Sequence, residues 1–334
     1  MRRIAPGAVR SHLQAIAKAP MLRYLLNRLV SAFLVLVMVS LFTFVLIWLV
    51  PGDVASQLAD PGASVEELQR IRARLNLDQP WHVQLLSWYG NLLRGDLGQS
   101  FLLNRSVTDA IIERLPVTLS LTVLALVIAV VLGVSAGIIA AVKHGGWADQ
   151  SIMALALVGL SIPDFWLGLV GIYVFAVALG WLPSGGFVPL TQDPVGWARS
   201  MALPAFTLGI TQVGLIARIT RSSMLDVLGQ DYVRTARAKG VPAFKVVAKH
   251  AFANALIPVI TVTGVIVGVL LGGAVVIEQV FSLPGVGRLI IGAVLRRDFP
   301  VIQGGLLLLA LIYVFVNIVV DLLYAYVDPR VRYG

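Results

Sequence analysis

Six long apolar runs dominate the sequence and limit what this chain can fold into. A hydrocarbon core about 30 Å thick requires roughly 20 apolar residues of α-helix. Only 13% of the 334 residues are charged, against about a quarter in soluble domains. We therefore expect an all-α polytopic membrane protein with six transmembrane helices. The runs lie near residues 28–50, 116–141, 151–180, 201–218, 256–279 and 302–327.

Basic residues between the runs indicate the orientation. The first run follows six Lys and Arg residues, and it is too long for a signal-peptide core. With the N-terminus inside, the inner segments hold 16 of the 26 Lys and Arg residues, which favours both termini in the cytoplasm. The expected divisions are an N-terminal cytoplasmic extension (1–27), a first transmembrane helix (28–50), an extracytoplasmic segment (51–115), a transmembrane core (116–327) that includes a cytoplasmic loop (219–255), and a cytoplasmic tail (328–334).

The extracytoplasmic segment is predicted to hold two amphipathic helices. Ser64 and Glu67 have the spacing of a capping box, and Pro80 can open a second helix. Trp81 and Trp88 on that helix belong at a membrane interface. The segment is either a lid packed on the helix ends or a surface that receives a partner or substrate.

The loop 219–255 is patterned. Asp231 suits an N-cap, Tyr232 to Lys239 can form two turns of helix, and Gly240 suits the left-handed position that ends one. Pro242 then permits a new helix to start. From these residues alone, a basic cytoplasmic connector and a docking element are both open interpretations.

The same loop carries a resemblance to a known family. The run from Asp231 to Gly240, DYVRTARAKG, resembles the coupling segment of the permease subunits of ABC importers, in the dipeptide, oligopeptide and nickel branch. Further stretches similar to that branch occur in order along the chain: Leu49–Asp53, Leu93–Gly98, Glu113–Leu119, Ile162–Gly168, Val280–Gly287 and Asp328–Tyr333.

The resemblance implies a type I ABC importer permease fold in the cell inner membrane. It implies partners as well: a second homologous permease, two ATP-binding subunits, an extracytoplasmic solute-binding protein and the lipid bilayer. The chain itself would bind no cofactor, because ATP and Mg belong to the ATP-binding subunits. The residues that the resemblance assigns to ATPase coupling are Asp231, Tyr232, Arg234, Thr235, Ala236, Arg237, Ala238, Lys239 and Gly240.

Catalytic and metal-binding patterns are missing from the sequence. There is no phosphate-binding Gly-x-x-x-x-Gly-Lys-Ser/Thr loop, no His-Glu-x-x-His and no Gly-x-Ser-x-Gly. The chain has no cysteine, and its four histidines are scattered. We therefore expect a transport subunit with no catalytic residues, no metal site and no ATPase site of its own. Topology explains the net charge of +9, so we expect no nucleic-acid partner.

Three polar residues are candidates for the translocation pathway. Asp164 falls within the third run beside Pro163, where an ionisable group is expected to face a cavity or a partner. Glu278 and Gln279 end the fifth run on the outer side. The alternatives are a structural hydrogen bond for Asp164 and an ordinary interfacial position for Glu278 and Gln279.

The expected function is that of a permease subunit that forms half of a pathway for dipeptides or oligopeptides. A permease for nickel or another small solute is the alternative within the same family. A secondary transporter would show two related halves with several buried charges, and a membrane enzyme would show a catalytic constellation; neither pattern is visible.

Overall fold

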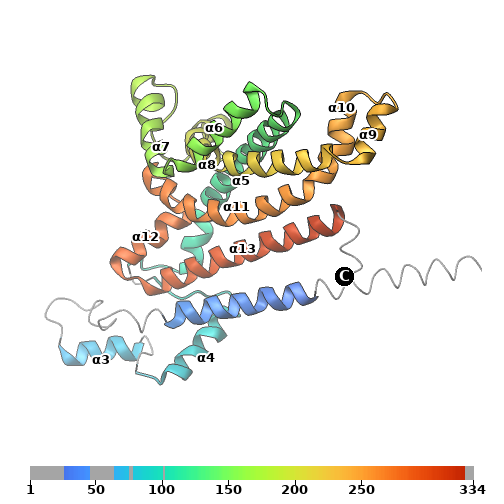
Figure 1. Cartoon of the computed structure of the whole chain (residues 1–334). Coiled ribbons are helices and arrows are strands. Elements are labelled where there is room, and N and C mark those ends of the chain that lie inside the picture. Colours follow the sequence, from blue (N-terminus) through green and yellow to red (C-terminus); the bar gives the residue numbers. More distant parts are fainter. Residues whose placement is uncertain (1–25, 46–63, 75–77, 101, 328–334) are drawn as a thin grey trace, which may run out of the picture. The chain divides into compact units, whose positions relative to one another are not determined.

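The computed structural model describes residues 26–45, 64–74, 78–100 and 102–327. These residues form helices joined by loops, and the one β-type pairing among them is an isolated bridge between Gln99 and Ser106 (Figure 1). Residues 46–50 of the first apolar run and the flanking segments 1–25 and 328–334 lie outside the described residues.

The helices confirm a polytopic membrane protein. Among the described residues, five helical stretches are long and apolar enough to cross a bilayer: Leu26–Val45, α5 (Val107–Val142), α8 (Pro194–Leu228), the continuous stretch Ala243–Val280, and α13 (Phe299–Val327). A bent pair of helices, Trp147–Ser161 and Asp164–Ala178, meets at 99° and makes a sixth candidate span if its two parts count as one.

The bend in the third span has a local cause. Ile162 is extended, with φ −87° and ψ 125°, as expected for a residue before proline. Pro163 lacks the N–H that would continue helix α6 (Trp147–Ser161). The chain restarts as α7 (Asp164–Gly171) and ends in a π-helical stretch, η1 (Ile172–Ala178). Asp164 therefore opens a new helix instead of lying within a straight one.

The chain divides into two compact units. Unit 1 comprises residues 1–34, 118–283 and 312–334, and unit 2 comprises residues 35–117 and 284–311. We describe each separately.

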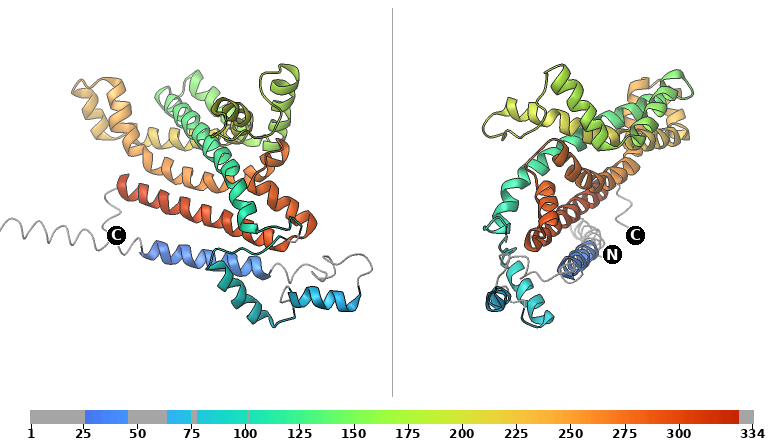
Figure 2. Two further views of the ribbon diagram at one scale, coloured as in Figure 1. Left: turned by 180° about the vertical axis from the view of Figure 1, so that it is seen from behind. Right: turned by 90° about the vertical axis from the view of Figure 1, so that its left-hand side faces the viewer.

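Helix α8 forms the centre of unit 1 and packs against α6, α7 and α11 (Ala253–Val280) (Figures 1 and 2). It also lies very close to α5. A Cβ atom added at Gly137 of α5 would come within 2.6 Å of the Ala217 carbonyl oxygen and 2.5 Å of Thr220 Cβ. Another added at Gly209 of α8 would meet the Ala125 carbonyl oxygen at 2.6 Å. Glycine here permits helix contact at backbone distance, as small residues do in membrane bundles.

Unit 2 holds the two predicted amphipathic helices. These are α3 (Val65–Arg74) and α4 (Trp81–Leu92). The Glu67 amide donates to Ser64 Oγ at 3.2 Å, which is one half of the predicted capping box. The Phe44 and Trp88 rings lie 5.9 Å apart, so α4 contacts the first helix through an aromatic pair.

The rest of unit 2 surrounds a small apolar core. Helix α12 (Val286–Arg296) was not predicted from the sequence, and it packs with the start of α5 and of α13. The core residues are Val107, Ala110, Ile111, Leu289, Ala293 and Val301. Buried Asp298 accepts a hydrogen bond of 2.5 Å from Ser100 Oγ, which ties the loop before α5 to the start of α13.

Several helices are longer than the apolar runs from which they were predicted. Helix α5 starts at Val107, inside the expected extracytoplasmic segment, and contains Pro116. Helix α8 runs from Pro194 to Leu228, so residues 219–228 of the expected cytoplasmic loop continue the helix. Apolarity marks the part of a helix that contacts lipid, whereas the helix itself continues wherever its backbone is paired.

Candidate functional site

The segment singled out by the sequence folds as a short helix with a defined end. Helix α9 spans Asp231–Ala238. The Gly240 amide donates to the Arg237 carbonyl at 2.9 Å, and the Val241 amide donates to the Ala236 carbonyl at 3.2 Å. Gly240 has φ +77°. These two bonds and the left-handed glycine make a Schellman motif. The left-handed position of Gly240 at the end of this helix was predicted from the sequence.

The start of α9 differs by one residue from the prediction. Gln230, with φ −72° and ψ 148°, occupies the N-cap position and makes no side-chain capping bond. Asp231 is the first helical residue, so its assignment as the N-cap was wrong. Its carboxylate still lies in the first turn, where a negative charge interacts favourably with the helix dipole.

The two faces of α9 differ in chemistry. Val233 is fully buried, whereas Arg234, Arg237 and Lys239 are exposed. The pair Arg234–Asp231 is separated by 3.8 Å and is highly exposed, so it adds little stability. The helix thus rests on the protein through an apolar anchor and presents basic side chains outward.

A compact base supports α9. The helix contacts the end of α8 and the π-helical stretch η2 (Val246–Phe252), which follows the short α10 (Ala243–Lys245). Figures 1 and 2 show α9 and α10 as a hairpin at the end of α11. The apolar cluster beneath contains Ala141, Met224, Ala251 and Ala255. Contacts from α8 and η2 therefore hold α9 within unit 1.

The pathway candidates lie in three different environments. Asp164 is half-buried at the start of α7, and a Cβ added at Gly273 of α11 would lie 3.2 Å from its Oδ2. Glu278 is fully buried and accepts a hydrogen bond of 2.6 Å from Thr118 Oγ1 of α5. Gln279 is exposed. The side chains of Glu278 and Gln279, although adjacent in sequence, therefore point in different directions and do not form one polar surface.

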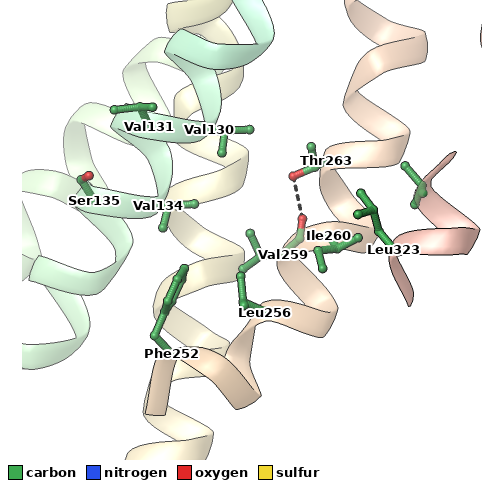
Figure 3. A pocket seen from close by; sticks show the side chains of 11 residues that line it. Val130, Val131, Val134, Ser135, Phe252, Leu256, Val259, Ile260, Thr263 and Leu323 are labelled. Carbon is green, nitrogen blue, oxygen red and sulfur yellow. Dashed lines mark hydrogen bonds between the residues drawn. The ribbon is translucent and has the colours of Figure 1, made fainter. Parts of the chain in front are cut away.

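An apolar pocket of about 420 Å³ lies between α5, α11 and α13 in unit 1 (Figure 3). Its lining includes Val134, Phe252, Leu256 and Leu323, and none of its lining side chains is charged. Thr263, one of its two polar side chains, donates to the Val259 carbonyl of its own helix at 2.7 Å. This pocket suits acyl chains or an apolar helix better than a charged solute.

Sequence reasoning missed two ion pairs of unit 1. Arg28 Nη2 of the first helix lies 2.8 Å from Asp321 Oδ1 of α13, and Arg221 of α8 binds Asp149 of α6. Opposite charges at the ends of apolar runs are the signal that could have suggested both pairs.

The described residues contain no group of three or more His, Asp or Glu side chains that could hold a metal ion.

Comparison with known proteins identifies the chain. Residues 133–333 match the family model described as the binding-protein-dependent transport system inner membrane component, and residues 21–122 match the model of its N-terminal part. The chain belongs to this family. The matched region of this permease subunit includes α9 and its base.

Relatives of the permease cover almost its whole length. A putative peptide transport system permease protein of Brucella abortus is 50% identical over 92% of this chain and 98% of its own length. A probable peptide ABC transporter permease of Sinorhizobium fredii is 42% identical over 93% and 99%. The glutathione transport system permease GsiC of Escherichia coli is 44% identical over 94% and 100%.

Solved structures show the same fold. The methionine ABC transporter MetNI, in an inward-facing conformation, matches with a TM-score of 0.55 at 19% identity and covers 65% of this chain and 95% of its own. An amino acid ABC transporter matches with a TM-score of 0.50 at 17% identity, over 66% and 94%. The predicted ABC importer permease fold is confirmed.

Proposed function

We propose that this permease forms half of the translocation pathway of a peptide importer driven by ATP. The observation that carries the proposal is the 50% identity, over 98% of its length, to a protein named as a peptide transport permease. Identity of this extent spans both family segments, so it includes the transmembrane helices as well as α9.

We propose that residues 231–240 couple the permease to ATP hydrolysis. Helix α9 is short, basic on its outer face and anchored by Val233, so it can enter a groove in a partner without losing its own fold. The Schellman motif at Gly240 sets the angle between α9 and the following helix. A rigid, projecting element is what a mechanical contact requires.

The proposed assembly contains this chain, a second homologous permease, two ATP-binding subunits and an extracytoplasmic solute-binding protein. ATP and Mg would act in the ATP-binding subunits, and this chain would contribute no catalytic residue. The proposed location is the inner membrane with both termini in the cytoplasm, which places α9 on the side where ATP is available.

Among the pathway candidates, we propose a role in the pathway for Asp164 and a structural role for Glu278. Asp164 is half-buried at the bend of the third span, where a carboxylate can meet a passing cationic or amide group. Glu278 is fully buried, so we propose that it holds α11 to α5 through Thr118 and does not contact solute.

The test is transport by the complete complex in proteoliposomes. We expect uptake of peptides that requires the binding protein and ATP and persists when ion gradients are collapsed. Uptake driven by an ion gradient without ATP hydrolysis would establish a secondary transporter instead.

Competition identifies the solute. Unlabelled di- and oligopeptides are expected to suppress uptake of a labelled peptide. Glutathione is the second candidate, because a 44% identical relative is named as its permease. If a nickel chelate suppresses uptake and the peptides do not, the solute is a nickel chelate and not a peptide.

A further inference from the structure

An ion pair outside the segment 231–240 joins α8 to the first turn of α6, next to the turn between α5 and α6. Arg221 Nε donates to Asp149 Oδ1 at 2.5 Å, and Arg221 Nη2 donates to Asp149 Oδ2 at 2.7 Å. The Gly145 amide of the turn donates to the same Oδ2 at 2.9 Å. His144 Nδ1 lies 3.0 Å from Arg221 Nη2. The Asp149 side chain is 4% exposed and that of Arg221 25%.

This geometry makes a strong and directional contact. A guanidinium that binds both carboxylate oxygens holds the relative orientation of two elements as well as their distance. The carboxylate is buried, so its contacts are screened less than those of a surface pair. Lysine cannot reproduce the two-pronged contact, because its ammonium acts as a point charge.

The position of Arg221 connects this contact to α9. Arg221 lies on α8, which continues to Leu228 and is followed by α9 at Asp231. Seven residues of helix from Arg221 to Leu228 correspond to about 10 Å along the axis. Earlier on α8, contacts at backbone distance hold the helix against α5 and α6, as at Gly137 and Gly214. The ion pair therefore lies on the helix that carries α9, beyond those glycine contacts.

We propose that Arg221 and Asp149 are positioning residues that make the α5–α6 turn move together with α9 during the transport cycle. This inference rests on the proposed coupling role of residues 231–240. A force on α9 acts first on the end of α8, and the bidentate contact passes it to the turn. Without the contact, that end of α8 keeps its apolar packing against α5 at Met224 and Ala141 but loses its directional contact to the first turn of α6.

The first test measures solute moved per ATP hydrolysed by the reconstituted complex. Arg221→Lys and Asp149→Asn are expected to lower this ratio about fivefold or more, the low end of typical coupling between linked sites. The double variant is expected to be no worse than the single ones, because both changes remove one contact. Arg218→Gln is the matched control, since Arg218 is exposed three residues earlier on α8.

The second test follows the movement itself and needs only variants that fold. The chain has no cysteine of its own that would react with a spin label. Lys143→Cys and Gln230→Cys therefore place one label on the α5–α6 turn and one just before α9. With cysteine-free partners, the label distance is expected to be the same in the nucleotide-free and ATP-trapped states. In the Arg221→Lys background the two distance distributions are expected to differ.

The outcomes separate this inference from the proposed function. Unchanged transport per ATP in folded Arg221→Lys and Asp149→Asn complexes overturns the inference, and so does a label distance that stays constant in the Arg221→Lys background. Failure of the permease to assemble with any ATP-binding subunit would instead remove the proposed function, whatever these variants do. A lowered ratio together with diverging distances supports both.

Discussion

Replacing Gly240 with valine is the most direct test of the coupling role proposed for residues 231–240. Gly240 has φ +77°, and a Cβ built there meets no heavy atom within 4 Å. The cost of valine is therefore backbone strain and not collision. A non-glycine residue held in a sparsely populated region costs about 1–3 kcal/mol, and a β-branched side chain makes φ > 0 a genuine outlier. Because 1.4 kcal/mol corresponds to a tenfold change in an equilibrium constant, the fraction of molecules in which α9 ends at Gly240 as observed falls by a factor of about 5 to 150.

Asparagine at the same position is the matched control, because it tolerates the left-handed conformation. Gly240→Asn is expected to transport nearly as well as the original chain, whereas Gly240→Val is expected to lose solute-stimulated ATPase activity and uptake. Both are measured in the reconstituted complex, after membrane insertion and binding of the ATP-binding subunits have been checked. If Gly240→Val inserts, binds those subunits and transports at the rate of the original chain, residues 231–240 are only a connector.

Three further predictions follow from the fold. Asp164→Asn is expected to support more uptake than Asp164→Leu, because the half-buried position retains a hydrogen-bonding group; equal uptake would remove Asp164 from the pathway. Gly137→Ala is expected to lower the melting temperature of the detergent-solubilised protein, since overpacking costs about 1–3 kcal/mol. Gly272→Ala is the control and is expected to leave the melting temperature unchanged, because no atom lies within 4 Å of the added Cβ. Reporter fusions after residue 145 are expected to report cytoplasm and those after residue 90 the outside; a cytoplasmic signal at residue 90 would overturn the topology.

The spans could be predicted from sequence because the bilayer imposes a simple rule. Each run needs enough apolar residues to cross about 30 Å, and its backbone must pair internally. The same rule explains the error at α8. The apolar run was ended at Arg218, yet the helix continues, and Thr220 and Met224 beyond it are buried. Those residues contact protein and not lipid, so the hydropathy of the sequence does not show that the helix continues through them.

The end of helix α9 at Gly240 was also predictable, because a glycine after a short amphipathic stretch is a local signal. The contact between Asp149 and Arg221 was not, since 72 residues separate them and nothing in a single sequence states that α6 and α8 are neighbours. Helix α12 was missed for a related reason. Its apolar residues, Leu289 and Ala293 among them, cover the core of unit 2 in a stretch too short to be read as a span.

The π-helical stretch η2 has a consequence for how this chain can vary in length. Its i→i+5 pairing fits about one more residue into the stretch than α-helical pairing would. Loss of one residue between Val246 and Phe252 can therefore be absorbed by a change to regular α-helix, leaving the register of α11 intact. Loss of one residue further along α11 would rotate everything beyond it by about 100° and turn its buried face toward lipid. Within the continuous helical stretch Ala243–Val280, η2 is thus the place where deletion of one residue is expected to be tolerated. Deletion near Gly268, where an added Cβ would lie 2.7 Å from the Tyr313 ring, is not expected to be tolerated.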